Sequence, residues 1–276
     1  MPTINTNVAA IRARSNLDKV QRDMDQSIAR LSSGKRITRA ADDAAGLAIS
    51  GRMESQIRGL NMSVRNIKDG QSLVDTSEGA MQEISSILQR MRELAVQASG
   101  GTVANADMDF LNLEVTQLVK EIDSISANTK FNDKTLLTGA AFVFYADIDV
   151  KGSTITAIAS DMTASAIAVS IKAVSIGAGK TQAKLSLVIS AIDNAISTVA
   201  LKRANMGAVS NRFDHVIDNL SNVVANTEAA KSRVLDADFA VETTQLTRNT
   251  ILQQAATSMV AQANAQKNSI LALIQG

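Results

Sequence analysis

Apolar side chains recur at alternating spacings of three and four residues along most of this chain. The most regular series is Met108, Leu111, Val115, Leu118, Ile122 and Ile125. Such spacing places apolar residues on one face of a helix. A repeat of about 3.5 residues keeps that face turned toward a partner helix, which is typical of coiled-coil packing. The segment is therefore predicted to be a helix that packs lengthwise against others.

Two longer segments share this pattern and are predicted to form a helical rod. The first extends from about residue 44 to 98, which corresponds to a helix about 80 Å long. Gly100 and Gly101 give it a natural end. Its apolar series is Ile57, Leu60, Val64, Ile67, Val74, Met81, Ile84, Leu88, Met91, Ala95 and Ala98. The later segment follows the series Ile192, Ile196, Val199, Met206, Phe213, Ile217, Leu220 and Val224.

Both ends of the chain carry apolar stripes of their own. A single amphipathic helix cannot bury its stripe alone, so the ends are predicted to pair with each other, with other copies of the chain, or with both. The predicted interface residues near the N-terminus are Ile4, Val8, Ile11, Leu17, Val20, Met24, Ile28 and Leu31. Those near the C-terminus are Leu252, Ala256, Met259, Ala263, Ile270 and Leu273.

The pattern changes in the middle of the chain, where apolar residues alternate with other residues. Alternation predicts short strands, in one or two hairpins whose pairing the sequence leaves open. A turn is predicted at residues 151–153 (KGS). The alternating residues are Phe142, Phe144, Ile148 and Val150, then Ile155 and Ala157, and then Ile167, Val169 and Ile171.

The predicted fold class is mainly α. We expect a long antiparallel helical-hairpin or coiled-coil rod formed by both chain ends, with a small β-rich insert. The predicted division has a terminal-helix core domain (1–43 and 234–276), a helical rod domain (44–140 and 180–233) and a short variable insert (141–179).

Composition supports this fold class. The 276 residues are 45% hydrophobic, yet only 3% are aromatic and none is tryptophan. Aromatic side chains usually supply much of the area buried in a globular core, so this composition suits narrow helix–helix seams. The only proline is Pro2, which leaves no obstacle to long helices further along. Absence of cysteine excludes a disulfide framework.

Charge and hydropathy limit the partners. The formal net charge is +1, so no basic excess attracts nucleic acid. No uninterrupted apolar run approaches the roughly 18 residues needed to span a bilayer, so membrane insertion is not expected. The N-terminal residues lack the basic and apolar regions of a secretory signal, so no cleavable signal peptide is expected.

Several longer motifs occur in a fixed order at the two ends of the chain. They are residues 4–8 (INTNV), 30–37 (RLSSGKRI), 42–49 (DDAAGLAI), 56–60 (QIRGL), 88–97 (LQRMRELAVQ), 232–240 (SRVLDADFA) and 262–264 (QAN). Through them the chain resembles the bacterial flagellins over about residues 3–140 and 182–276. The middle is short for that family, and Arg39 and Ile67 stand where smaller residues are expected.

The resemblance implies a function that the periodicities alone do not give. A flagellin-like chain is expected to be exported unfolded through the flagellar type III channel and to polymerise, under a filament cap, into the extracellular flagellar filament used for motility. Its paired terminal helices would form the inner core. The implied partners are other copies of the chain, an export chaperone at the C-terminal segment, the filament cap and hook-junction proteins.

The resemblance also implies a possible innate-immune contact. Gln89, Arg90, Leu94 and Glu114 match the face that the vertebrate flagellin-sensing Toll-like receptor reads in the family. The alternative interpretation is that this face forms contacts between protofilaments, and both interpretations apply to the same residues.

No catalytic, cofactor or metal site is predicted, and an enzyme is not expected. Residues 179–181 (GKT) lack the glycine that a phosphate-binding loop needs five residues earlier, where Val174 stands. His215 is the only histidine and cannot form a two-histidine zinc site. The carboxylate pairs Asp42/Asp43 and Asp236/Asp238 open amphipathic stretches, which favours helix capping or inter-subunit pairing.

Two rival functions share these features. A hook–filament junction protein has the same terminal architecture but joins filaments in few copies. A secreted adhesin or receptor ligand would act through the central insert instead.

Overall fold

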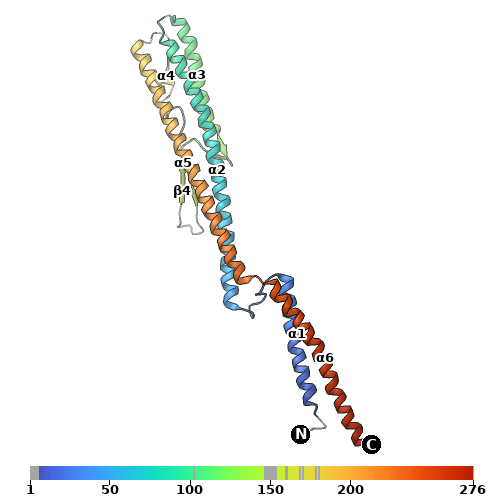
Figure 1. The fold of residues 1–276 in the computed structure, drawn as a ribbon. Helices are drawn as coiled ribbons and strands as arrows, with labels where there is room; N and C mark the ends of the chain where they lie inside the picture. Colours follow the sequence, from blue (N-terminus) through green and yellow to red (C-terminus); the bar gives the residue numbers. More distant parts are fainter. Residues whose placement is uncertain are drawn as a thin grey trace. The chain divides into compact units, whose positions relative to one another are not determined.

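The computed structural model describes residues 6–101, 103–145, 154–158, 161–167, 169, 171–177, 179 and 181–275. Long helices dominate, as Figure 1 shows, and the predicted mainly α fold class is confirmed. In chain order the elements are α1 (Val8–Ser33), α2 (Ala44–Ala98), α3 (Asn105–Asn128), β1 (Lys130–Phe131), β2 (Lys134–Thr135), β3 (Ala141–Tyr145), β4 (Thr154–Ile158), α4 (Ile171–Val174), α5 (Gln182–Leu235) and α6 (Phe239–Gln275).

The chain divides into two compact units. Unit 1 comprises Met1–Ile57 and Ala225–Gly276, and unit 2 comprises Arg58–Val224. These boundaries fall inside α2 and α5, whereas the predicted three-part division places them near residues 43 and 234, where helices begin or end. That division into a core domain, a rod domain and an insert stays a prediction.

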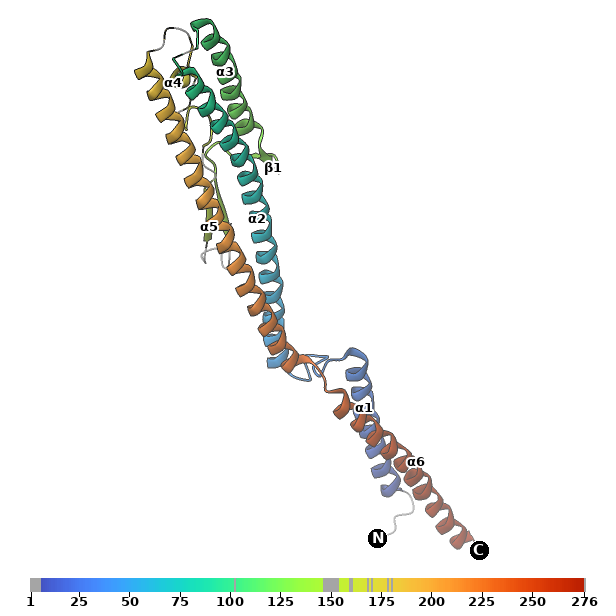
Figure 2. The same ribbon diagram turned by 45° about the horizontal axis from the view of Figure 1, so that its top comes forward.

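Unit 1 is built on an antiparallel pair of terminal helices, α1 and α6, which lie side by side in both views (Figures 1 and 2). The side chain of Asn7 caps the first turn of α1 by accepting a hydrogen bond from the backbone N–H of Ala10, at 3.1 Å. Gly34 ends the helix because it adopts a φ of 68°, which favours glycine.

Aspartates order the connections of unit 1. Asp42 accepts hydrogen bonds from the backbone N–H groups of Thr38 and Arg39, each at 3.0 Å, and from the Thr38 hydroxyl at 2.9 Å. Asp43 caps the start of α2, and Asp238 caps the start of α6. The helix-capping interpretation is therefore confirmed for Asp43 and Asp238, whereas Asp42 orders the loop before α2 instead.

Unit 2 consists of α3 and parts of α2 and α5, with the β-hairpins packed beside them. The two long helices run antiparallel: Gln71 donates to Asp214 at 3.0 Å, and Arg92 donates to Asp193 at 2.6 Å. Its largest fully buried side chains are Phe213, Ile67, Met81, Ile84, Leu88, Met91, Leu94, Ile122, Leu136, Leu137, Ile155 and Met162. The apolar series predicted for these helices thus supply most of one continuous core.

The predicted insert contains one antiparallel hairpin in its described part. β3 pairs with β4 so that Phe144 faces Ile155. The ring of Phe144 meets that of Phe213 edge to face, with centroids 5.5 Å apart. Ile148, Val150 and the predicted turn at 151–153 lie outside the described residues.

The third predicted strand, at Ile167–Ile171, is wrong. The described part of this segment forms a turn, and α4 begins at Ile171. Local turns take the place of a strand partner: the backbone N–H of Ile167 donates to the carbonyl oxygen of Thr163 at 3.1 Å, and that of Val169 donates to the carbonyl oxygen of Ala164 at 2.8 Å. Side chains of α3 bond the flanking residues, since Asp123 accepts from the backbone N–H of Ala164 at 2.8 Å and Asn112 from that of Ile176 at 2.9 Å. Because these bonds satisfy the backbone, the apolar residues can enter the core without a sheet.

One described helix, α5, is long and apolar enough to cross a membrane by length and composition alone. Asp193 interrupts the apolar run of this helix, which is why no membrane-spanning run was expected from the sequence. Leu185, Val188 and Ile192 of this helix are buried in unit 2, so packing within the chain accounts for its apolar stripe.

Candidate assembly surfaces

The two terminal helices face each other along matching heptad positions. These positions are the buried or half-buried residues of each helix that follow one another at alternating spacings of three and four. We call them the terminal seam. On α1 they are Ala10, Ala13, Leu17, Val20, Met24, Ser27 and Leu31. On α6 they are Glu242, Leu246, Asn249, Gln253, Ala256, Val260 and Ala263.

Polar contacts cross the terminal seam at three levels. The guanidinium of Arg30 pairs with Glu242, with Nη1 and Oε1 3.0 Å apart. Further along, Gln253 donates from Nε2 to Oε1 of Gln21 at 2.7 Å. Near the start of α1, Asn7 donates from Nδ2 to the carbonyl oxygen of Ala263 at 3.1 Å. The three contacts fit one antiparallel register.

The predicted interface residues do not form one stripe per helix. Six of them lie in the terminal seam, namely Leu17, Val20, Met24, Leu31, Ala256 and Ala263. Five others remain exposed, namely Val8, Ile11, Ile28, Leu252 and Met259. The apolar residues of each helix cover an arc wider than a single partner helix can bury, so the stripe divides. Ile4 lies outside the described residues, and so do the side chains of Ile270 and Leu273.

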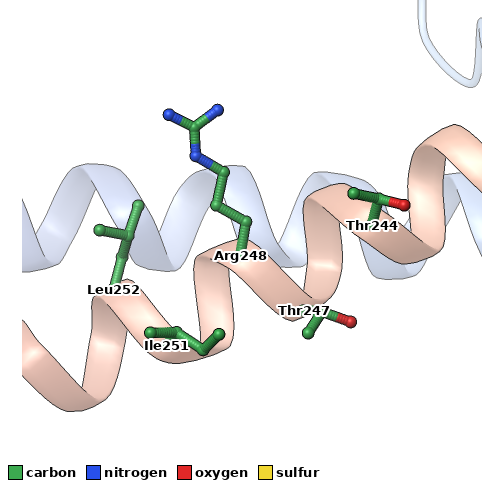
Figure 3. Close-up of a pocket in the computed structure, with 5 residues that line it drawn as sticks. All are labelled: Thr244, Thr247, Arg248, Ile251 and Leu252. Carbon is green, nitrogen blue, oxygen red and sulfur yellow. The ribbon is translucent and has the colours of Figure 1, made fainter.

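The five exposed residues and Ile251 lie outside the terminal seam, and we refer to them collectively as the outer face of unit 1. Met259 is 63% exposed and Ile251 is 61% exposed, although both are large apolar side chains. Figure 3 shows a shallow hollow on α6 lined by Thr244, Thr247, Arg248, Ile251 and Leu252. Sequence reasoning missed Ile251. It could have been found as an apolar residue that lies next to the predicted heptad positions but does not occupy one of them.

A second surface lies on α2 and α3 of unit 2. Arg90 bridges the helices by donating from Nε to Glu114 at 3.0 Å, and it donates from Nη1 to Glu93 at 3.1 Å. These bonds, the one to Glu114 first, raise the pKa of Arg90 above its ordinary value. Gln89 is exposed beside it. Leu94 does not share this face, because its side chain is 1% exposed in the core.

Two exposed apolar residues of α3 were not foreseen. Phe110 is 70% exposed and Leu113 is 60% exposed. Both stand outside the register of the core series on the same helix, which is the signal that could have identified them as surface residues. An exposed pair of this kind adds apolar area to unit 2 that the chain itself does not cover.

The described residues contain no group of three or more His, Cys, Asp or Glu side chains that could hold a metal ion. His215 is exposed on α5. Thr181 stands immediately before α5, at the capping position, and its carbonyl accepts from the backbone N–H of Lys184. Lys180 of the GKT segment lies outside the described residues.

Comparisons with known proteins identify the family. The model for the bacterial flagellin N-terminal helical region matches residues 4–141, and that for the C-terminal helical region matches residues 189–274. The chain is 42% identical to a flagellin of Halalkalibacterium halodurans, over 99% of each protein. It is 39% identical to a flagellin of Bacillus subtilis, again over 99% of each. The chain belongs to the bacterial flagellin family.

The flagellin family models leave residues 142–188 unmatched, a stretch that holds most of β3, all of β4 and α4. The terminal seam and the outer face both lie inside the matched regions. Among further relatives, a flagellar filament 31.3 kDa core protein of Treponema maltophilum is 37% identical over 99% of each protein. A flagellar hook-associated protein structure from Vibrio parahaemolyticus shares the flagellin fold over 71% of this chain, with a TM-score of 0.63 at 15% identity.

Proposed function

We propose that this flagellin chain is a structural subunit that polymerises with copies of itself into the bacterial flagellar filament. Its mechanism is self-association, with no catalytic step. Relatives that match nearly the whole chain carry the names flagellin and flagellar filament core protein, which supports the assignment. The single structural observation behind it is the outer face, which exposes large apolar side chains on helices already paired with each other.

Physical reasoning favours copies of the same chain as the partners. An exposed apolar surface on a soluble protein usually marks an interaction site. If the outer face of one copy contacts a different surface of the next, the arrangement does not close and it grows into a helical filament. The terminal helices would then form the core of the polymer, as the resemblance implies.

Replacing Leu252 and Met259 with serine tests this function. Both side chains are exposed, so the monomer should keep its helical content while filament growth is lost. The matched control is Val143→Ser, a 48% exposed position on β3 in the unmatched middle of the chain. Electron microscopy of concentrated protein is the readout. Filaments of normal length from the double variant would refute an assembly role for the outer face.

Deleting residues 235–276 tests the whole C-terminal helix. The remaining chain should stay soluble and helical but should not polymerise. A related expectation is that residues 1–42 and 234–276 are mobile in the free monomer and become ordered on assembly, because interface segments gain their stability from partners. Hydrogen exchange measures this, and strong protection of both ends in the monomer would contradict it.

The finer cellular assignments follow from family membership. We infer export through the flagellar type III channel, an extracellular location in the filament, and contacts with the filament cap and hook-junction proteins. An export chaperone would dock on the C-terminal segment. Binding of such a chaperone should be lost in the chain that lacks residues 235–276.

Recognition by the flagellin-sensing Toll-like receptor is assigned to the face of Gln89, Arg90 and Glu114. Since Leu94 is buried, it would support that face through packing rather than by contact. Arg90→Ala should therefore lower signalling in a receptor reporter assay without changing stability, whereas Leu94→Ala should lower both. Unchanged signalling by both variants would remove the receptor proposal.

The rival functions have less support. The hook-associated protein resembles this chain in fold alone, at 15% identity. An adhesin that used the insert would lose its activity, but not its polymerisation, when residues 141–179 are removed.

A further inference from the structure

The terminal seam is unusually polar for a helix pair. Among the described side chains of α1 and α6, the only ones that are buried rather than half-buried or exposed are Ser27, Glu242 and Asn249. Nδ2 of Asn249 and Nε of Arg30 are buried without a hydrogen-bond partner. Unsatisfied groups of this kind lower stability, so the polar seam is not explained by stability alone.

Apolar packing in the rest of the seam defines the register poorly. Alanine occupies four seam positions, Ala10 and Ala13 on α1 and Ala256 and Ala263 on α6. Side chains this small form similar layers after a shift of one heptad. At one end, a backbone bridge already joins the segments next to the two helices: the N–H of Arg36 donates to the carbonyl oxygen of Leu235 at 2.7 Å, and that of Ala237 donates to the carbonyl oxygen of Gly34 at 3.0 Å. Along the seam itself, a buried polar position is the device best known to select one alignment.

A one-heptad slip would break the polar contacts in either direction. The shift moves one helix by about 10.5 Å along the other. In one direction Glu242 would lie opposite Met24, buried without a cation. In the other it would pass beyond Ser33, the last residue of α1, and Arg30 would lose its partner. The Glu242 side chain is only 10% exposed in the seam. Leaving its charge without a partner there would destabilise the helix pair.

We propose that the Arg30–Glu242 ion pair and the Gln21–Gln253 hydrogen bond determine the register of the α1–α6 pair. The register in turn sets where the exposed residues of α1, such as Ile11, lie relative to those of α6, such as Leu252. A partner that contacts both helices therefore binds a surface whose shape depends on this register. The proposal concerns the register that α1 and α6 adopt whenever they pair within one chain. If the ends are mobile in the free monomer, all three probes oxidise more slowly, but the ratio of their rates still reports the register.

Disulfide trapping in the full-length chain tests the register, because the natural sequence has no cysteine. The pair Leu17→Cys/Ala256→Cys probes the native alignment. Leu17→Cys/Ala263→Cys and Ala10→Cys/Ala256→Cys probe a slip of one heptad in each direction. Oxidation is followed on non-reducing gels at low protein concentration, where intrachain bonds form without mixing between copies.

Each probe pair is placed in three backgrounds. The first is the natural seam. The second removes the four polar contact side chains with the substitutions Gln21→Leu, Arg30→Leu, Glu242→Leu and Gln253→Leu. The third is a control, Arg92→Leu/Asp193→Leu, which removes an ion pair of unit 2 and leaves the seam intact. Far-UV circular dichroism of each variant confirms that the helices are retained.

With the natural seam, the native probe should oxidise at least about tenfold faster than either slipped probe, because the slip exceeds the separation that a disulfide can bridge. The control should keep that ratio. In the leucine background the slipped probes should approach the native one to within about threefold. An unchanged ratio in that background, or equal rates with the natural seam, would overturn the proposal. Loss of all three disulfides would also overturn it, because the contacts would then control pairing rather than register.

Discussion

Two glycines of α2 differ only in what surrounds them, and they make a matched pair for substitution. Gly79 is exposed, and a Cβ there would meet nothing within 4 Å. Gly70 is buried, and a Cβ there would lie 2.9 Å from Cε1 and 3.0 Å from Cδ1 of Phe144. We therefore expect alanine to stabilise the helix at Gly79 and to strain the structure at Gly70.

The magnitudes follow from two opposing effects. Replacing glycine by alanine inside a helix stabilises it by about 0.5–1 kcal/mol, and this gain applies equally at both positions. At Gly70 the new methyl must displace the Phe144 ring, which packs edge to face against the fully buried Phe213. Overpacking of this kind costs about 1–3 kcal/mol. Gly79→Ala should therefore be more stable than Gly70→Ala by about 1–3 kcal/mol.

Urea unfolding of the full-length chain provides the measurement, with circular dichroism and tyrosine fluorescence as probes. Tyr145 is the only tyrosine, it follows Phe144 in β3, and no tryptophan obscures its signal. A double-mutant cycle adds Phe144→Ala, which should convert Gly70→Ala from destabilising to stabilising. If Gly70→Ala is as stable as Gly79→Ala, or if the cycle shows no coupling, the reasoning about this contact is refuted.

Three further expectations follow from single positions. Phe213→Ala should destabilise unit 2 by about 3–5 kcal/mol, whereas the exposed Phe110→Ala should change stability by under about 0.5 kcal/mol, as measured by urea unfolding. Asn249→Leu should stabilise the terminal pair by about 1–3 kcal/mol in hydrogen exchange, because it removes an unsatisfied buried amide; a loss of stability would contradict this. Backbone and side-chain hydrogen bonds from Thr38 lower the pKa of Asp42 below its ordinary 3.8, so they stabilise the loop above that pH and are lost as pH falls through the lowered value. The protection factor of the Thr38 amide, taken against intrinsic exchange at the same pH, should fall only in that acid range, and a fall already near neutral pH would count against the assignment.

The long helices could be predicted from the sequence because their signal is repeated many times. The core series of α2, α3 and α5 each continue over several turns, and no proline interrupts them. The same local reasoning failed at Ile167–Ile171, where alternation predicted a strand. There the backbone N–H groups of Ile167 and Val169 bond within a turn, to the carbonyl oxygens of Thr163 and Ala164. The flanking residues Ala164 and Ile176 bond to Asp123 and Asn112 of α3, more than forty positions earlier, and no local pattern identifies such partners.

The candidate surfaces were predictable in kind but not in detail. Apolar periodicity indicated that the ends of the chain form interfaces. The periodicity could not show which of these residues face the partner helix. The apolar stripe is wider than one helix–helix seam, and nothing in the sequence marks which part of it lies in the seam. Leu94 illustrates the same limit in unit 2: its motif places it beside Arg90 in the sequence, while the helix turns its side chain into the core.

The distribution of side chains in unit 1 explains why association with further copies is the natural outcome. A helix pair that is stable by itself buries its largest apolar residues between its helices and exposes polar ones. Here the seam contains Glu242, Asn249 and several alanines, while Met259 and Ile251 face outward. Large apolar side chains of these helices are therefore left available to another molecule. In this proposal the two surfaces have different tasks. The polar contacts of the terminal seam set the register of α1 and α6, and the apolar side chains of the outer face supply the affinity for other copies.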